Sequence, residues 1–180
     1  MPILEKLEEW PKPDNVTTLL RISVIVIIAI FPAMQVFFMQ SGDIVNIIES
    51  QLSFSGVKMK WQYFIILFNN GIDAYRLAQI LDYIFMFGYG TVIFCIAIKI
   101  SRNFESSSRW YKVSLIIAFL GIASAGLDAF ENAFILLTLT DPLCFPDWWT
   151  VAHSCFALPK YIGLLTSIAW AVIAVIKIRR

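Results

Sequence analysis

The chain has 180 residues, of which 59% are hydrophobic and only 15% are charged. A typical soluble domain is about half apolar and about a quarter charged, so the excess apolar surface here must face something other than water. The formal net charge of +1 and the lack of any basic block argue against a nucleic-acid partner. The length fits a single domain that covers residues 1–180.

The cysteine and histidine content excludes several redox and metal sites. Cys95, Cys144 and Cys155 form no CxxC pair, which argues against zinc knuckles and a thioredoxin-like motif. His153 is the only histidine, so one chain cannot supply bis-histidine haem ligation or a three-histidine zinc site. A metal site built from carboxylates alone stays open, but we predict neither a metal nor a cofactor.

Four apolar stretches are each long enough to cross a bilayer, which takes about 20 helical residues. In chain order they are residues 22–39, 80–100, 113–139 and 161–178. Pro32 is expected to kink the first helix. That stretch is not a typical secretory signal, because its apolar core is long and no small-residue cleavage site follows it. The sequence therefore predicts an all-α integral membrane protein, a four-helix bundle in the cell (inner) membrane.

Basic residues predict the orientation, because cytoplasmic loops carry an excess of lysine and arginine. Most lie before the first span, between the second and third, and after the fourth: Lys6, Lys12, Arg21, Lys99, Arg102, Arg109, Lys112, Lys177, Arg179 and Arg180. The other two loops hold only Lys58, Lys60, Arg76 and Lys160. Both termini are thus predicted to be cytoplasmic, and loops 41–79 and 140–160 to face outward.

The first outer loop, residues 41–79, is too long and too apolar to be a plain linker. Apolar residues at roughly helical spacing predict a helix over residues 43–52. The apolar run 61–68 is too short to span, so we expect it to lie in the membrane interface or to cap the bundle. Residues 69–71, Asn-Asn-Gly, indicate a turn, after which Asp73 opens the helix that continues into the second span.

Six polar residues lie where a bilayer core would surround them, and burying an ionisable group there is costly. They are Asp82 and Tyr89 in the second span, Asp128, Glu131 and Asn132 in the third, and Lys160 at the start of the fourth. At about 1.5 Å per residue from the cytoplasmic lysines of their helices, Asp82, Asp128 and Lys160 all lie roughly 24–25 Å up. We therefore predict that the six residues converge in the outer half of the bundle, with Lys160 offsetting part of the carboxylate charge.

The role of this polar cluster stays open at the level of sequence. Buried ion pairs often only hold helices together or fix their register. Asp82 and Lys160 could instead lie at the interface and extend to water. The remaining interpretation is a site for a ligand, an ion or a proton.

Small residues on the second and third spans predict close helix packing. On the second span these are Gly88 and Gly90, and on the third they are Ala123, Ala125 and Gly126. Without a side chain, a glycine lets two helix backbones approach closely, which is how helices associate within a bilayer.

The second outer loop, residues 140–160, carries three further features. Cys144 and Cys155 could form a disulfide in an oxidising compartment, with free thiols as the alternative. Trp148 and Trp149 are typical of an aromatic anchor at the membrane interface. His153 has no partner motif and is expected to be a polar surface residue.

Four short motifs resemble those of a family of small, mostly bacterial membrane proteins whose function is not known. They are Gln51-Leu-Ser-Phe-Ser-Gly56, Asp82-Tyr-Ile-Phe-Met-Phe-Gly-Tyr89-Gly90, Leu127-Asp-Ala-Phe-Glu131-Asn132 and Leu158-Pro-Lys160-Tyr161. The chain departs from the family's pattern at Pro159 and in the cysteine-bearing outer loop. The resemblance implies a four-span helical membrane protein and assigns no activity, substrate or cofactor.

Three functions fit these features. The first is a non-enzymatic accessory protein that binds a membrane lipid, a protein partner or further copies of itself. The second is an oligomeric transporter of protons or small ions, with Asp82, Asp128 and Glu131 as the relay. The third, a lipid-modifying enzyme with Asp128 and Glu131 as acid and base, is ranked last because no nucleophile or metal motif accompanies them.

Overall fold

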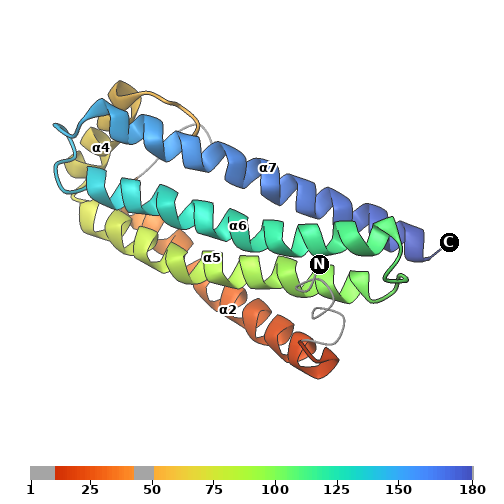
Figure 1. The fold of residues 1–180 in the computed structure, drawn as a ribbon. Coiled ribbons are helices and arrows are strands. Elements are labelled where there is room, and N and C mark those ends of the chain that lie inside the picture. The colour runs from red at the N-terminus through yellow and green to blue at the C-terminus, as the bar shows by residue number, and fades with distance from the viewer. Residues whose placement is uncertain (1–10, 43–50, 180) are drawn as a thin grey trace.

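The computed structural model describes residues 11–42 and 51–179, which form helices and no strands. The helices are α2 (Pro13–Gln40), α4 (Gly56–Phe68), α5 (Ile72–Ser101), α6 (Arg109–Thr138) and α7 (Asp147–Ile178), shown in Figure 1. All except α4 are long and apolar enough to cross a membrane. The predictions of an all-α fold and of four long apolar helices are thus confirmed for the described residues. The helix predicted over residues 43–52 lies largely outside them.

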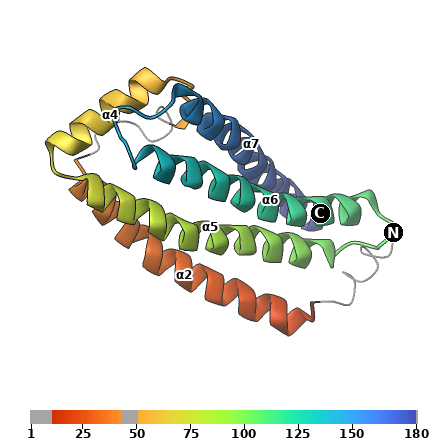
Figure 2. The ribbon, with the colours of Figure 1, turned by 60° about the vertical axis from the view of Figure 1, so that its left-hand side comes forward.

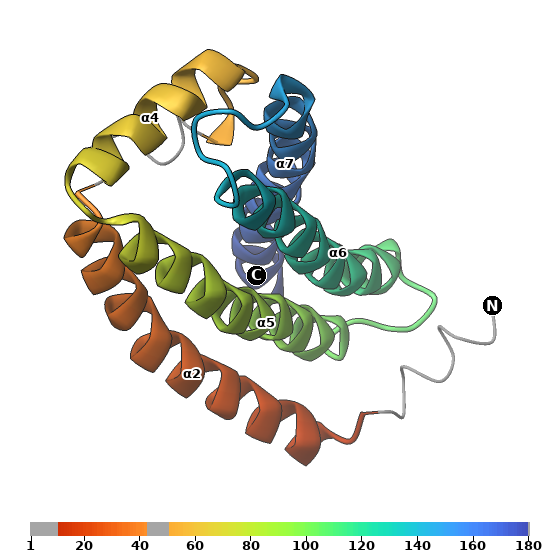
Figure 3. The same ribbon diagram turned by 90° about the vertical axis from the view of Figure 1, so that its left-hand side faces the viewer.

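The four long helices form an open arc rather than a closed bundle. Helix α2 packs on α5, α5 on α6, and α6 on α7, while α2 and α7 share no substantial interface. Figure 3 shows the order α2, α5, α6 and α7, with α2 and α7 as the two ends of the arc. Figure 2 shows α4 lying across the end of the arc where α5 begins and α6 finishes. There α4 contacts α5 and α7, so the short apolar run caps the helices as expected.

The last helix begins earlier than the sequence predicts. Helix α7 starts at Asp147 and includes most of the segment expected to be the second outer loop. Asp147 lies in its first turn, where a negative charge interacts favourably with the helix dipole. Pro159 lies inside α7 and removes one intrahelical hydrogen bond, yet the helix continues through it. Lys160 therefore lies well within a helix and not at its start.

A tight turn joins α4 to α5 at the predicted position. Asn70 has a φ of 56°, a left-handed conformation that asparagine tolerates better than most residues. The Asn69 side-chain amide donates a hydrogen bond of 3.0 Å to the Ile65 carbonyl. Gly71, the next residue, packs against the backbone of Ser41. A Cβ atom at Gly71 would lie only 2.0 Å from the Ser41 carbonyl oxygen. Asp73 lies in the first turn of α5, so the predicted turn and helix start are both confirmed.

Two apolar clusters form the core at opposite ends of the long helices. One surrounds Ile98 and Leu115 near the α5–α6 connection. The other surrounds Tyr63, Tyr75 and Phe145 beneath α4. Between them α5 and α6 approach closely at Gly90, where an added Cβ would lie 2.7 Å from the Ala125 Cβ. The polar residues singled out from the sequence lie between these two clusters.

Candidate functional site

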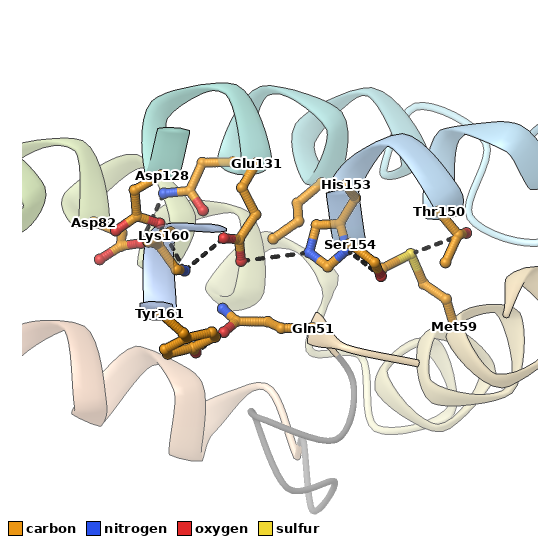
Figure 4. Close-up of polar contacts among 12 residues, drawn as sticks. Gln51, Met59, Asp82, Asp128, Glu131, Thr150, His153, Ser154, Lys160 and Tyr161 are labelled. Carbon is orange, nitrogen blue, oxygen red and sulfur yellow. Dashed lines mark hydrogen bonds and ion pairs between the residues drawn. The ribbon is translucent and has the colours of Figure 1, made fainter. Parts of the chain in front are cut away.

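Lys160 forms the centre of the polar cluster. Its Nζ lies 3.0 Å from Asp128 Oδ1 and 2.5 Å from Glu131 Oε2. The Lys160 side chain is 5% exposed, the Asp128 side chain 6%, and the Glu131 side chain is completely buried. Asp128 and Glu131 lie one turn apart on α6, and α7 brings Lys160 between them, as Figure 4 shows. One ammonium group thus pairs with two carboxylates.

The other three predicted site residues join the same network. The Asn132 amide donates a hydrogen bond of 2.7 Å to Asp82 Oδ2. The Tyr89 hydroxyl donates one of 2.8 Å to Asp128 Oδ2. The structure therefore brings the six residues together from α5, α6 and α7. Among the described residues, Asp82 is the one carboxylate of this network for which no ion pair with a cation is found.

His153 is a member of the network that the sequence prediction placed wrongly. It is 1% exposed and its Nε2 lies 3.5 Å from Glu131 Oε1. The expectation of a surface loop residue fails because α7 begins at Asp147, which places His153 two helical turns before Lys160. Residues seven apart lie on the same helix face. If the last helix is extended back to Asp147, the seven-residue spacing of His153 and Lys160 predicts that both face the cluster.

The segment before α4 also reaches the cluster. The Tyr161 hydroxyl donates a hydrogen bond to Gln51 Oε1, and the Phe54 amide donates one of 3.3 Å to Ser154 Oγ. Figure 4 shows Tyr161 and Gln51 together below Lys160 and Glu131. These contacts join the segment before α4 to α7, and neither Gln51 nor Ser154 was predicted as a site residue.

The possible disulfide between Cys144 and Cys155 is not present. Both cysteines are free and exposed. Cys144 lies in the α6–α7 connection, whereas Cys155 lies within α7, because the helix extends further toward its N-terminus than predicted. The loop is thus not stapled by a disulfide. Trp148 in the first turns of α7 is exposed, as an interfacial anchor requires.

A cavity of about 490 Å³ adjoins the polar cluster. Its polar lining includes Gln79, Asp82, Asp128, His153 and Lys160. Its apolar lining comes mainly from α2, α5 and α7 and includes Phe31, Met34, Phe38, Phe85, Leu164 and Ile168. Ligand pockets usually have volumes of roughly 300–1,000 Å³ and are mostly apolar with a few polar groups. This cavity has both properties, and it lies between the two ends of the arc.

Several buried acceptors near the cavity lack hydrogen-bond partners. Among the described residues these include Gln79 Oε1 and Asn132 Oδ1. Gln79 is 3% exposed and lines the cavity. Buried polar atoms are almost always paired in folded proteins, so the Gln79 acceptor is available to a hydrogen-bond donor in the cavity.

The contacts of Ser154 and Glu131 with His153 resemble a catalytic triad only superficially. His153 Nδ1 lies 3.5 Å from Ser154 Oγ, and Ser154 is completely buried. Ser154 is not among the residues that line the cavity. Glu131 is already paired with Lys160 at 2.5 Å. A nucleophile needs access to its substrate and a base within about 2.6–3.2 Å, so this arrangement does not activate Ser154.

No group of three or more histidine, cysteine or acidic residues among those described is arranged to hold a metal ion. The chain matches no family model, no curated protein and no solved structure. The chemistry of the cluster and its cavity is therefore the basis of the functional argument.

Proposed function

We propose that this protein is a non-enzymatic integral membrane protein that binds a membrane amphiphile in the cavity between α2 and α7. It crosses the cell (inner) membrane four times, with both termini in the cytoplasm. The proposed topology rests on the four apolar helices and on the distribution of lysine and arginine, most of which lie before α2, between α5 and α6, and at the end of α7.

The cavity is the observation that carries the binding proposal. Its apolar lining suits a hydrocarbon chain, and its charged floor suits a polar headgroup. Phe31 on α2 and Ile168 on α7 line the cavity while remaining 46% and 60% exposed. In a bilayer these residues would border the lipid phase, so an amphiphile could enter sideways without crossing water.

The two competing functions have less support. A proton or ion relay would need polar groups toward the cytoplasmic end, but that core is formed mainly by apolar residues such as Cys95, Ile98 and Leu115. A lipid-modifying enzyme would need a reactive group that reaches the cavity, and Ser154 does not line it. The unpaired acceptors and the cavity favour binding over both.

The topology predicts that Cys144 is labelled from outside the cell. Cys144 is exposed in the α6–α7 connection, and a membrane-impermeant maleimide should modify it in intact cells of a Cys155→Ser strain. Cys95 is buried and should stay unmodified, so the double variant Cys144→Ser, Cys155→Ser is the negative control. Labelling that requires permeabilised cells would mean that the orientation is reversed.

The binding proposal predicts that a tryptophan at Leu164 displaces the ligand. Leu164 lines the cavity, so the larger ring of Leu164→Trp should occupy the space of the bound chain. Native mass spectrometry of the wild-type protein, released gently from membranes, should show an added lipid-sized mass. In Leu164→Trp we expect the fraction of protein that carries this added mass to fall by roughly tenfold or more.

Leu165→Trp is the matched control. Leu165 is the next residue of α7 but is 68% exposed and does not line the cavity, so this variant should keep the bound mass. A wild-type protein that carries no lipid, or two variants that behave alike, would contradict binding in the cavity. An added mass of protein size would instead indicate a partner subunit.

A further inference from the structure

Two residues of α5 present hydrogen-bond acceptors to the same part of the cavity. Gln79 and Asp82 lie three residues apart, which places them on one face of the helix. Both line the cavity. Within residues 11–42 and 51–179, Gln79 Oε1 has no hydrogen-bond partner, and the one hydrogen bond found for Asp82 comes from the Asn132 amide. Gln79 and Asp82 thus place acceptors at the cavity, and each can accept further hydrogen bonds.

The charges of the cluster are also unbalanced at Asp82. Lys160 is occupied by Asp128 and Glu131, at 3.0 and 2.5 Å. His153 lies against Glu131, at 3.5 Å, and so serves a different carboxylate. Lys160 thus pairs with two of the three carboxylates, and no ion pair of Asp82 is found within the described part of the chain. An uncompensated carboxylate is expensive within a bilayer and is usually found beside a partner or a functional site.

A ligand that donates hydrogen bonds and carries positive charge would complement this pair. A primary ammonium group does both, since it has three donors and no acceptor. A phosphate or carboxylate headgroup would meet acceptors and like charge, which costs free energy. The ring centroids of Phe31 and Phe85 lie 5.6 Å apart and those of Phe85 and Tyr89 5.7 Å apart. Such an aromatic wall also attracts cations.

We propose that the cavity selects a long-chain primary amine, with its ammonium group bound between Asp82 and Gln79 and its hydrocarbon chain along the apolar lining formed by Leu164 and Ile168. This inference rests on the proposed function and specifies the ligand class. The volume of about 490 Å³ suits a single-chain amphiphile better than a phospholipid with two chains.

The test compares three amphiphiles that share a chain and differ at the polar end: hexadecylamine, hexadecanol and palmitic acid. Each is titrated into the full chain in phosphatidylcholine nanodiscs, with empty nanodiscs to subtract partitioning into the lipid. Wild-type protein should bind hexadecylamine at least about tenfold more tightly than hexadecanol, the gain expected from a charge-assisted hydrogen bond. Palmitic acid should bind most weakly.

Two substitutions at the pair should change this preference in opposite directions. Asp82→Asn keeps an acceptor for Asn132 but removes the charge, so the preference for hexadecylamine over hexadecanol should fall to about twofold or less. Gln79→Glu adds a second acid beside Asp82 and should raise the preference above that of the wild type. Asp73→Asn is the matched control, because Asp73 is exposed, pairs with Arg76 and does not line the cavity.

The outcomes separate this inference from the proposed function. If the wild type binds hexadecanol or palmitic acid as tightly as the amine, the amine selectivity is wrong while amphiphile binding stands. If none of the three binds above empty nanodiscs, both proposals fail. An unchanged preference in a folded Asp82→Asn variant would also overturn the assignment of the ammonium site.

Discussion

Replacing Lys160 with methionine is expected to destabilise the fold by about 3–5 kcal/mol, the usual cost of removing one partner of a buried ion pair. Methionine fills nearly the same volume, so the loss would come from charge and not from a hole. Asp128 and Glu131 would be left facing each other without the ammonium group that lies 3.0 and 2.5 Å from them. Unfolding of the purified variant in mild detergent, followed by circular dichroism, measures the effect.

Lys60→Met provides the matched control for this prediction. Lys60 pairs with Asp147 at 2.7 Å, but both side chains are partly exposed, at 29% and 67%. Exposed ion pairs contribute less than about 1 kcal/mol, so the same substitution there should change stability little. A Lys160→Met variant as stable as Lys60→Met would mean that the buried carboxylates do not depend on the lysine.

Neutralising the two acids as well should restore part of the stability. In the triple variant Lys160→Met, Asp128→Asn and Glu131→Gln, no buried carboxylate of this trio is left without a counter-ion. Replacing a whole buried ionic group with neutral residues is often close to neutral for stability. Recovery in the triple variant would show that the single variant fails through unpaired charge, whereas no recovery would point to disrupted packing around α7.

The four long helices could be predicted because length and apolarity are properties of each segment alone. Which helix packs against which could not be predicted from the sequence. That α2 contacts α5 while leaving α7 apart depends on which helix faces complement each other across the whole fold. The open arc, and with it the cavity, therefore emerges only from the three-dimensional structure.

For the polar cluster, the depth of each side chain along its helix could be predicted, but the direction in which it points could not. A fixed rise per residue sets the height of a side chain along its helix, so Asp82, Asp128 and Lys160 could be predicted to lie at one level. The rotation of each helix decides which groups meet. Pairing of Lys160 with Asp128 and Glu131, and not with Asp82, is a result of that rotation.

His153 was missed for a more local reason. Pro146 and Pro159 both suggest a break, and the sequence between them is less apolar than a typical span, so the segment resembles a loop. Pro146 in fact immediately precedes α7, and Pro159 is accommodated within it. Prolines within membrane helices are tolerated because neighbouring groups satisfy the freed backbone atoms. The histidine is thereby carried into the buried network beside Glu131.

Replacing Gly90 with leucine, at a close approach of α5 and α6, is expected to destabilise the fold by roughly 1–3 kcal/mol or more. Gly90 on α5 faces α6, where even a Cβ would lie 2.7 Å from Ala125 Cβ and 3.3 Å from the Gly121 carbonyl oxygen. Because both neighbours lie on or next to the backbone, they cannot move aside as a flexible side chain would. Leucine would therefore push α5 and α6 apart, and the Tyr89–Asp128 hydrogen bond with them.

Gly126→Leu is the control that isolates this effect, since the sequence alone predicted packing roles for both glycines. Gly126 has no neighbour within 4 Å of an added Cβ, so its predicted packing role is wrong, and leucine there should be neutral or slightly stabilising through its better helix propensity. Both variants are unfolded in the same detergent. Equal stability of the two would mean that the α5–α6 contact at Gly90 does not hold the helices together. A selective loss in Gly90→Leu, accompanied by weaker hexadecylamine binding, would link this packing to the geometry of the cavity.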